Sequence, residues 1–347
     1  MYYQFTQSKE TIFFRVDGDS GQKAGLGHIY RTLKIYRFLK NVFKNEYNFI
    51  FLMKNYKLGR ELIHNETKEK IITYNSSLSK KLFNVNDIVI IDTLGVEKFF
   101  LKFLNKIGIK KIISFDELDL KNFRRGVIIN GIYFAKKKIT LYSKKISIYQ
   151  GPKYLILNKY FYKKKRKLYC KNNKIKILVT SGGADNKNFL FKIVKLLNFY
   201  KKINCDIVVV AGKGVKKNNP IYGFRKLKNI KILNNVKNMK KIFDRVHMSI
   251  VSGGTVMFES ICCGKVTLVC QTYPHQIFAT RYFERKKIIE NIGSINQLKQ
   301  DVLNNYFKNF DKFKKNYKSL FLKRTKEIDG KGLLRVKKII CKYINDK

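Results

Sequence analysis

The chain has 347 residues, enough for about two domains at roughly 150 residues per domain. Hydrophobic residues make up 45% and aromatic residues 14% of it, which excludes disordered, collagen-like and linker-dominated classes. Lys and Arg total 74 against 24 Asp and Glu, a formal net charge of +50. The charge fits a polyanion partner, but lysines run from end to end and Trp is absent, as AT-rich coding also produces. Charge alone therefore does not distinguish a binding surface from a solvated lysine surface.

The cysteines show no zinc-ligand spacing, so the sequence predicts no metal site. The start of the chain lacks the apolar core of a signal peptide, and no apolar run approaches the roughly 18 residues needed to span a bilayer. We therefore expect a cytoplasmic protein whose thiols are small core residues. The six cysteines are Cys170, Cys205, Cys262, Cys263, Cys270 and Cys341.

Short β-branched and aromatic runs alternate with longer helical patterns, which predicts an α/β fold with parallel sheets. In the first half, a helix is expected over Ile29–Phe43, behind a glycine-rich turn. The strands expected there are Thr11–Val16, Phe49–Met53, Asp87–Ile91 and Lys111–Phe115.

The pair Gly151-Pro152 marks a break in a chain that has only three prolines. We expect an N-terminal domain over 1–158, a basic linker over 159–173, a second domain over 174–330 and a helical tail over 331–347. The strands expected in the second half are Ile175–Val179, Cys205–Val210, Met248–Val251 and Lys265–Val269. The helices expected there begin near Lys187, cover Val236–Phe243, Thr255–Cys263 and Gln276–Lys286, and continue as a lysine-rich tail from about Asn296.

The turn between the first strand and the first helix ends in Gly25-Leu26-Gly27-His28. Glycines let backbone N–H groups approach a ligand, and the helix N-terminus favours an anion. The turn lacks the third glycine of a dinucleotide fingerprint and the Gly-Lys-Ser/Thr of a P-loop, so it supports neither a nicotinamide enzyme nor an NTPase. A helix N-terminus disfavours the imidazolium, so His28 could serve as a base near neutral pH, or simply hydrogen-bond its loop. Arg31 shares its helix face and could bind an anion.

Two further glycine turns precede helices in the second half, at Ser181-Gly182-Gly183 and at Ser252-Gly253-Gly254-Thr255. Together they could supply backbone donors to a pyrophosphate, although ordinary α/β turns have the same composition. Glu259, one turn into the following helix, could accept hydrogen bonds from ribose hydroxyls or be a solvated helix residue.

Other polar residues stand at expected strand ends, where open α/β sheets bind ligands. His275 and Gln276 follow one strand of the second half and could reach a ligand. In the first half, the strand-end carboxylates are Asp92 and the pair Asp116-Glu117. His64 and His247 lack such a context, and we interpret both as structural.

The pattern Arg15-Val16-Asp17 followed by Gly25-Leu26-Gly27-His28-Ile29-Tyr30-Arg31 resembles the R-x-D…G-x-G-H-x-x-R opening of a hydrolase family. That family acts on UDP-2,4-diacetamido-2,4,6-trideoxy-β-L-altropyranose in pseudaminic acid biosynthesis. Its linker signature G-P-x-Y-x-L-L-R-P-x-F is similar to Gly151–Phe161 of this chain, and the resemblance continues at 182–188 and 252–276.

The resemblance implies a glycosyltransferase-B-like fold, two Rossmann-like domains with parallel sheets facing a central cleft, related to the enzyme that adds N-acetylglucosamine in peptidoglycan synthesis. It implies hydrolysis without a metal or cofactor, in which His28 is the base and water attacks the anomeric carbon with inversion. The substrate-binding residues it suggests are Arg15, Asp17, Gly25, Gly27, Arg31, Asp92, His275 and Gln276. The UDP-binding residues it suggests are Gly182, Gly183, Ser252, Gly253, Gly254, Thr255 and Glu259.

Departures from the family pattern fall near the expected sugar pocket. Leu94 stands where the family has tyrosine, His275 replaces an asparagine, and Asn158 replaces the linker arginine. A glycosyltransferase using a UDP-sugar donor for a surface polysaccharide therefore remains an alternative, and a non-catalytic polyanion-binding protein is a second one. We expect a monomer whose partner is a UDP-sugar, with no specific nucleic acid. Peripheral contact with an anionic membrane is a further use of the charge.

Overall fold

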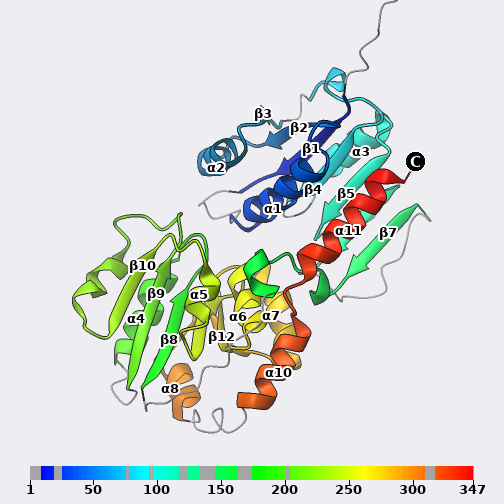
Figure 1. Cartoon of the computed structure of the whole chain (residues 1–347). Helices are drawn as coiled ribbons and strands as arrows, with labels where there is room; N and C mark the ends of the chain where they lie inside the picture. The colour runs from blue at the N-terminus through cyan, green and yellow to red at the C-terminus, as the bar shows by residue number, and fades with distance from the viewer. Residues whose placement is uncertain are drawn as a thin grey trace, which may run out of the picture. The chain divides into compact units, whose positions relative to one another are not determined.

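The computed structural model describes residues 9–18, 26–75, 78–93, 95, 97–116, 123–132, 145–162, 174–185, 187–199, 204–308 and 317–346. The chain divides into two compact units (Figure 1). One comprises Met1–Asp19, His28–Tyr154 and Leu334–Lys347, and the other comprises Ser20–Gly27 and Leu155–Leu333.

The first unit is built on a seven-stranded sheet in which every neighbouring pair is parallel. The strand order is β3-β2-β1-β4-β5-β6-β7, so it reverses direction beside β1. In open α/β sheets such a reversal is where ligands bind, beyond the carboxyl ends of the strands. The strands are β1 (Thr11–Val16), β2 (Asn48–Met53), β3 (Lys70–Thr73), β4 (Ile88–Asp92), β5 (Lys111–Phe115), β6 (Gly126–Asn130) and β7 (Ile146–Gln150).

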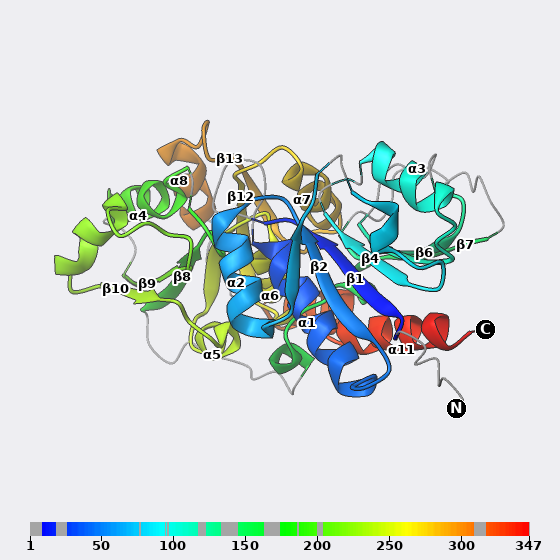
Figure 2. The same ribbon diagram turned by 90° about the horizontal axis from the view of Figure 1, so that it is seen from above.

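Helices cover both faces of this sheet, which explains why its central strands are almost continuously apolar. The two views place α1 (Gly27–Val42) and α11 (Gly332–Asn345) on one face and α3 (Lys98–Lys106) on the other (Figures 1 and 2). Under α3, the core includes Phe13, Val89 and Phe100. The remaining helices of this unit are α2 (Lys57–Thr67) and 3-10 turns over Lys80–Leu82 and Pro152–Tyr154.

The C-terminal helix α11 packs on the first unit although it is last in the sequence (Figure 1). The Tyr343 hydroxyl donates to the carbonyl of Lys110 at 3.3 Å, and Lys111 Nζ donates to the carbonyl of Ile344 at 2.5 Å. The Lys337 ammonium lies 4.4 Å from the ring centroid of Phe38, on α1. The end of the chain thus covers the same face of the sheet as α1.

The second unit contains a six-stranded parallel sheet with the order β10-β9-β8-β11-β12-β13. Its strands are β8 (Ile175–Thr180), β9 (Cys205–Ala211), β10 (Ile230–Asn234), β11 (Met248–Ser252), β12 (Val266–Gln271) and β13 (Glu290–Ser294). Its helices are α4 (Phe189–Phe199), α5 (Met239–Phe243), α6 (Thr255–Cys262), α7 (Gln276–Arg285), α8 (Gln300–Lys308) and α10 (Tyr317–Glu327), with 3-10 turns over Lys159–Tyr162 and Pro220–Lys226. Its core includes Ile177 on β8, Phe189 on α4 and Leu303 on α8.

The predicted α/β architecture with two parallel sheets is confirmed, and each predicted strand is present with shifts of one or two residues at its ends. Some helix starts were placed too early. The helix expected near Lys187 begins at Phe189, the one expected from Val236 begins at Met239, and the tail expected from Asn296 begins at Gln300. Among the described helices, none is both long and apolar enough to cross a membrane.

Candidate functional site

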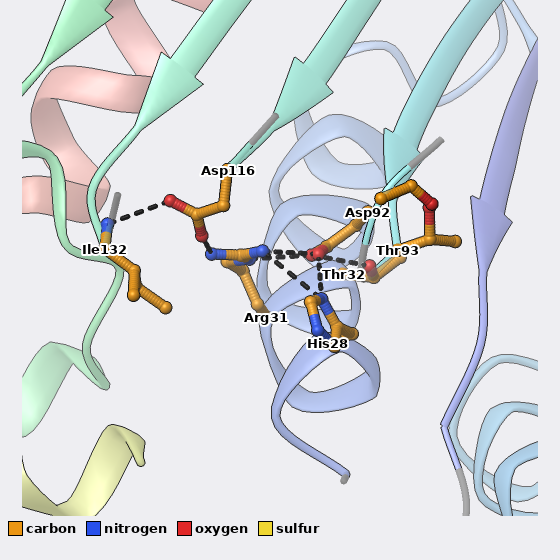
Figure 3. A network of polar contacts seen from close by, with 8 residues as sticks. His28, Arg31, Thr32, Asp92, Thr93, Asp116 and Ile132 are labelled. Carbon is orange, nitrogen blue, oxygen red and sulfur yellow. Dashed lines mark hydrogen bonds and ion pairs between the residues drawn. The ribbon is translucent and has the colours of Figure 1, made fainter. Parts of the chain in front are cut away.

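A histidine and an aspartate meet at the carboxyl edge of the first sheet (Figure 3). His28 stands in the first turn of α1, and Asp92 is the last residue of β4. His28 Nδ1 lies 2.6 Å from Asp92 Oδ1, and the imidazole side chain is 19% exposed. An ionised carboxylate only accepts hydrogen bonds, so Nδ1 carries the proton of the neutral imidazole and Nε2 keeps its lone pair. That is the tautomer a general base requires.

Asp92 is also held by Arg31, one turn further along α1. Arg31 Nε donates to Asp92 Oδ2 at 2.7 Å, and Nη2 donates to Oδ1 at 2.5 Å. The Thr32 hydroxyl donates to Oδ2 at 3.2 Å. The Asp92 side chain is fully buried, both its oxygens accept hydrogen bonds, and one of them faces His28 Nδ1. The same burial leaves it no surface for the substrate contact expected from the sequence.

A second buried carboxylate, Asp116, follows β5 and accepts a hydrogen bond from Arg31 Nη1 (Figure 3). Burial disfavours the charged form of Asp92, but the charges of Arg31 and His28 outweigh it and hold the pKa of Asp92 below its ordinary value. Burial likewise opposes the Arg31 charge, yet Asp92 and Asp116 raise the pKa of Arg31. The cluster is therefore one guanidinium between two carboxylates. The sequence indicated Asp116 only as a strand-end carboxylate, and Thr32 was not singled out.

Arg15 and Asp17, the R-x-D pair of the sequence pattern, form a separate buried group beside β1. Arg15 Nη2 donates to Asp17 Oδ2 at 2.6 Å, and its guanidinium lies 3.8 Å from the ring centroid of Tyr74. Asp17 Oδ1 in turn accepts from the backbone N–H of Lys54 at 2.9 Å. Arg15 and Asp17 thus tie together segments that follow β1, β2 and β3.

In the second unit, the two glycine turns differ in how the helix after each is capped. Asp185 caps α4, because its Oδ1 accepts from the backbone N–H of Phe189 at 2.7 Å and of Leu190 at 3.4 Å. Asn219 Nδ2 donates to the same carboxylate at 3.1 Å. At α6 the N-cap is Gly254, and no side chain among the described residues caps that helix. Met257 N–H donates to the Gly254 carbonyl at 3.0 Å, so the N-terminal amides of α6 that can bind an external anion are those of Thr255 and Val256.

Gly182 and Gly183 form a turn into which another glycine loop fits closely. Gly182 has φ +92°, a left-handed conformation that suits glycine. A Cβ on Gly212 would come within 2.2 Å of the Gly182 carbonyl oxygen, and Gly214 N–H donates to the Gly183 carbonyl at 2.8 Å. The Ser252 hydroxyl donates to the Ser181 carbonyl at 2.8 Å, linking the two turns that follow β8 and β11.

Gln276 has a clear local function at the start of α7. Its Oε1 accepts from Thr272 N–H at 2.9 Å and from Tyr273 N–H at 3.4 Å, so it braces the turn after β12. A Cβ on Gly253 would lie 2.8 Å from the Gln276 Cβ, so glycine is needed there. His275 is exposed and stacks on Tyr273 with ring centroids 5.5 Å apart.

Three further candidates stand as follows. Glu259 is half-buried on α6, one turn after Thr255. Gly27 is the first residue of α1, directly before His28. Gly25 lies outside the described residues, as do Leu94, Glu117 and linker positions 163–173. His247, predicted to be structural, accepts through Nδ1 from Lys176 N–H at 2.9 Å.

Sequence comparison finds no matching family model, but it finds two relatives among curated proteins. The chain is 32% identical to the uncharacterized protein MJ1062 of Methanocaldococcus jannaschii over 264 residues, which are 71% of this chain and 53% of that protein. It thus spans about half the length of that relative. It is 25% identical to the spore coat polysaccharide biosynthesis protein SpsG of Bacillus subtilis over 333 residues, covering 93% of this chain and 96% of SpsG.

Comparison of structures finds glycosyltransferases over almost the whole chain. MurG of Acinetobacter baumannii superposes with a TM-score of 0.59 and 10% identity, covering 96% of this chain and 99% of MurG. The kitacinnamycin glycotransferase superposes with a TM-score of 0.61 and 11% identity, covering 97% of this chain and 100% of that protein. VinC, a glycosyltransferase solved in complex with dTDP, superposes with a TM-score of 0.55 and 9% identity, covering 95% of this chain and 100% of VinC. The fold of this chain is that of the GT-B glycosyltransferases.

Proposed function

We propose that this chain is an enzyme of polysaccharide biosynthesis that binds a UDP-sugar in its second unit and transfers the sugar to an acceptor, with His28 as general base. The similarity to SpsG supports the biosynthetic role, and the glycosyltransferases of the same fold support transfer. The observation that carries the proposal is the His28–Asp92 pair, whose hydrogen bond at Nδ1 leaves Nε2 able to take a proton.

The reaction in this proposal is a displacement at the anomeric carbon. His28 Nε2 removes the proton of the acceptor hydroxyl as its oxygen bonds to that carbon. The bond from the anomeric carbon to the diphosphate oxygen breaks, UDP leaves, and the configuration inverts. The amides of Thr255 and Val256 at the α6 N-terminus stabilise the charge that develops on the departing diphosphate. Glu259 accepts hydrogen bonds from the ribose.

Hydrolysis is the second candidate, in which water replaces the acceptor and free sugar is released. It is favoured by the sequence pattern that contains Arg15, Asp17, His28 and Arg31. These four residues belong to two polar groups at one edge of the sheet. The groups are the Arg15–Asp17 pair and the Arg31–Asp92–His28 cluster. The same base serves water or an alcohol, so the dyad alone does not choose between the two reactions.

The deciding experiment follows UDP and sugar by NMR while the protein is incubated with UDP-2,4-diacetamido-2,4,6-trideoxyhexoses or UDP-N-acetylglucosamine in EDTA. UDP release that requires added lipid or oligosaccharide acceptor supports transfer. Stoichiometric UDP and free sugar without acceptor would establish hydrolysis instead. Either activity must disappear in His28→Ala. Absence of any UDP binding would overturn the proposal of a UDP-sugar enzyme.

A further inference from the structure

We propose that Asp116 is a positioning residue that acts through Arg31 and Asp92 to fix the orientation and the tautomer of His28. The inference rests on the proposed function, because it concerns the residue assigned there as the base. Asp116 touches neither His28 nor any reacting group in this scheme. Its effect is transmitted by a guanidinium that contacts both carboxylates of the cluster (Figure 3).

Asp116 is buried and anchored by a backbone hydrogen bond as well as by Arg31. Its Oδ1 accepts from the backbone N–H of Ile132 at 2.8 Å, and its side chain is 1% exposed. Its backbone has φ +52°, a left-handed conformation that costs energy for a residue with a side chain. The strain and the anchor together fix the second oxygen as an acceptor for Arg31 Nη1.

Arg31 transmits this fixed position to the dyad. Asp116 holds Arg31 Nη1, while Arg31 Nε and Nη2 donate hydrogen bonds to the two oxygens of Asp92 in a planar fork. The orientation of Asp92 then sets the direction of its hydrogen bond to His28 Nδ1. Arg31 Nη2 itself lies only 3.4 Å from His28 Nδ1, so the guanidinium charge acts directly on the imidazole.

The position of Arg31 depends on Asp116. Among the described residues, the charged groups in contact with His28 are Asp92 at the end of β4 and Arg31 on α1, and Asp116 at the end of β5 contacts Arg31 from the other side. Without the Asp116 carboxylate, Arg31 Nη1 loses this charged acceptor, and the fork that holds Asp92 is no longer fixed at its third nitrogen.

Asp116→Asn is the appropriate variant because asparagine tolerates positive φ as well as aspartate does. It removes the charge without changing the shape of the side chain. Glu66→Gln is the matched control, since it removes one carboxylate from the same unit at an exposed ion pair with Arg37. Its side chain is 39% exposed, so its charge is screened by solvent.

The experiment is long-range ¹H–¹⁵N NMR of ¹⁵N-histidine-labelled protein with neutral imidazoles, in which His28 is identified by the signal lost in His28→Gln. In the parent protein we expect the Nδ1–H tautomer, because Nδ1 faces Asp92. In Asp116→Asn the two tautomers of His28 should be mixed, because Arg31 no longer holds Asp92 in one orientation. Glu66→Gln should give the same tautomer as the parent. A folded Asp116→Asn with the parental tautomer would overturn the inference.

A second comparison covers the case in which Asp116→Asn does not fold. Arg31→Lys keeps Asp116 and the positive charge but removes the planar fork that joins Asp116 to Asp92, so the His28 tautomers should be mixed in it. A folded Arg31→Lys that keeps the parental tautomer would show that the orientation of His28 does not depend on the connection through Arg31 and would overturn the inference. No substrate is needed for these measurements, so their failure and the failure of the proposed enzymatic function are distinguishable.

Discussion

Asp92 Oδ1 lies 2.6 Å from His28 Nδ1, on a carboxylate that is itself fully buried. The charges of Arg31 and His28 prevail over burial and keep the pKa of Asp92 low, so the acceptor stays ionised across the neutral range. An ionised acceptor at Nδ1 fixes one tautomer and stabilises the imidazolium once it forms. In the proposed reaction, this relationship supports a base at His28 Nε2 that is oriented by Asp92.

Asp92→Asn should lower kcat by about 10²-fold or more, because an amide can donate to Nδ1 and so favour the wrong tautomer. UDP affinity should be unchanged, since the nucleotide is proposed to bind in the other unit. Steady-state kinetics and calorimetric titration with UDP measure the two effects. Glu66→Gln again serves as the control. Full activity in Asp92→Asn would remove the dyad from the mechanism.

His28→Ala should abolish turnover of the UDP-sugar while leaving UDP affinity within about twofold of the parent, because it removes the base and no proposed nucleotide contact. Single-turnover assays combined with UDP titration measure this. An equal loss of turnover and UDP binding would instead make His28 a binding residue.

Glu259→Ala should weaken UDP binding by about tenfold, the effect of losing one charge-assisted hydrogen bond to ribose, and should change the chemical step less. Deoxyuridine diphosphate provides the matched ligand, because it lacks one ribose hydroxyl. It should bind to the parent more weakly than UDP does, whereas Glu259→Ala should bind the two ligands equally. If the variant binds UDP as the parent does, Glu259 does not hold the ribose.

The central strands of both sheets could be predicted because they are buried on both faces and appear as apolar runs, as in Ile88–Asp92. The strand Gly126–Asn130 was not predicted, although all of its residues are buried. Edge elements such as β3, with no fully buried residue, gave no comparable signal. Helix α2 was missed because Gly59 interrupts it. A Cβ there would lie 2.1 Å from the Gly18 carbonyl oxygen, so close packing overrides helix propensity.

The candidate site was predictable only in part. Strand-end position indicated Asp92 and Asp116, and the glycine turn indicated His28. The sequence could not show that Arg31 lies between the two carboxylates, because that depends on the spacing of β4 and β5 beneath α1. Nor could it show that Asp185 caps its own helix while α6 has no side-chain cap among the described residues.

A side chain caps α4, but none among the described residues caps α6, and this difference leads to a prediction at Thr255, the first residue of α6. Proline is tolerated at this position, and the extended backbone of Gly254 (φ −87°, ψ −158°) is compatible with a following proline. Thr255→Pro should therefore fold normally but lose one amide donor, weakening UDP binding by about tenfold or more relative to Thr255→Val. Lys57→Pro, at the equivalent position of α2, is the control for stability. Unchanged UDP affinity would place the diphosphate elsewhere.

The last prediction concerns Lys265, whose side chain is fully buried and whose Nζ has no hydrogen-bond partner among the described residues. Burial lowers the pKa of Lys265 to about 8, from an ordinary value of 10.5. Below pH 8 the ammonium is charged in both folded and unfolded chains, so its full burial cost weakens the fold. Between pH 8 and 10.5 the folded chain loses the proton first, the unfolded chain binds more protons, and the free energy of unfolding rises.

Lys265→Met should therefore be more stable than the parent at pH 7, by about 2 kcal/mol or a few degrees in Tm. The difference should shrink steadily as pH rises from 8 towards 10.5, because the neutral amine costs less to bury. Thermal unfolding at pH 7 and pH 9.5 measures both effects, with exposed Lys216→Met as the control for loss of a surface charge. If the parent and Lys265→Met have the same Tm at pH 7, the charge of Lys265 is compensated in the folded chain.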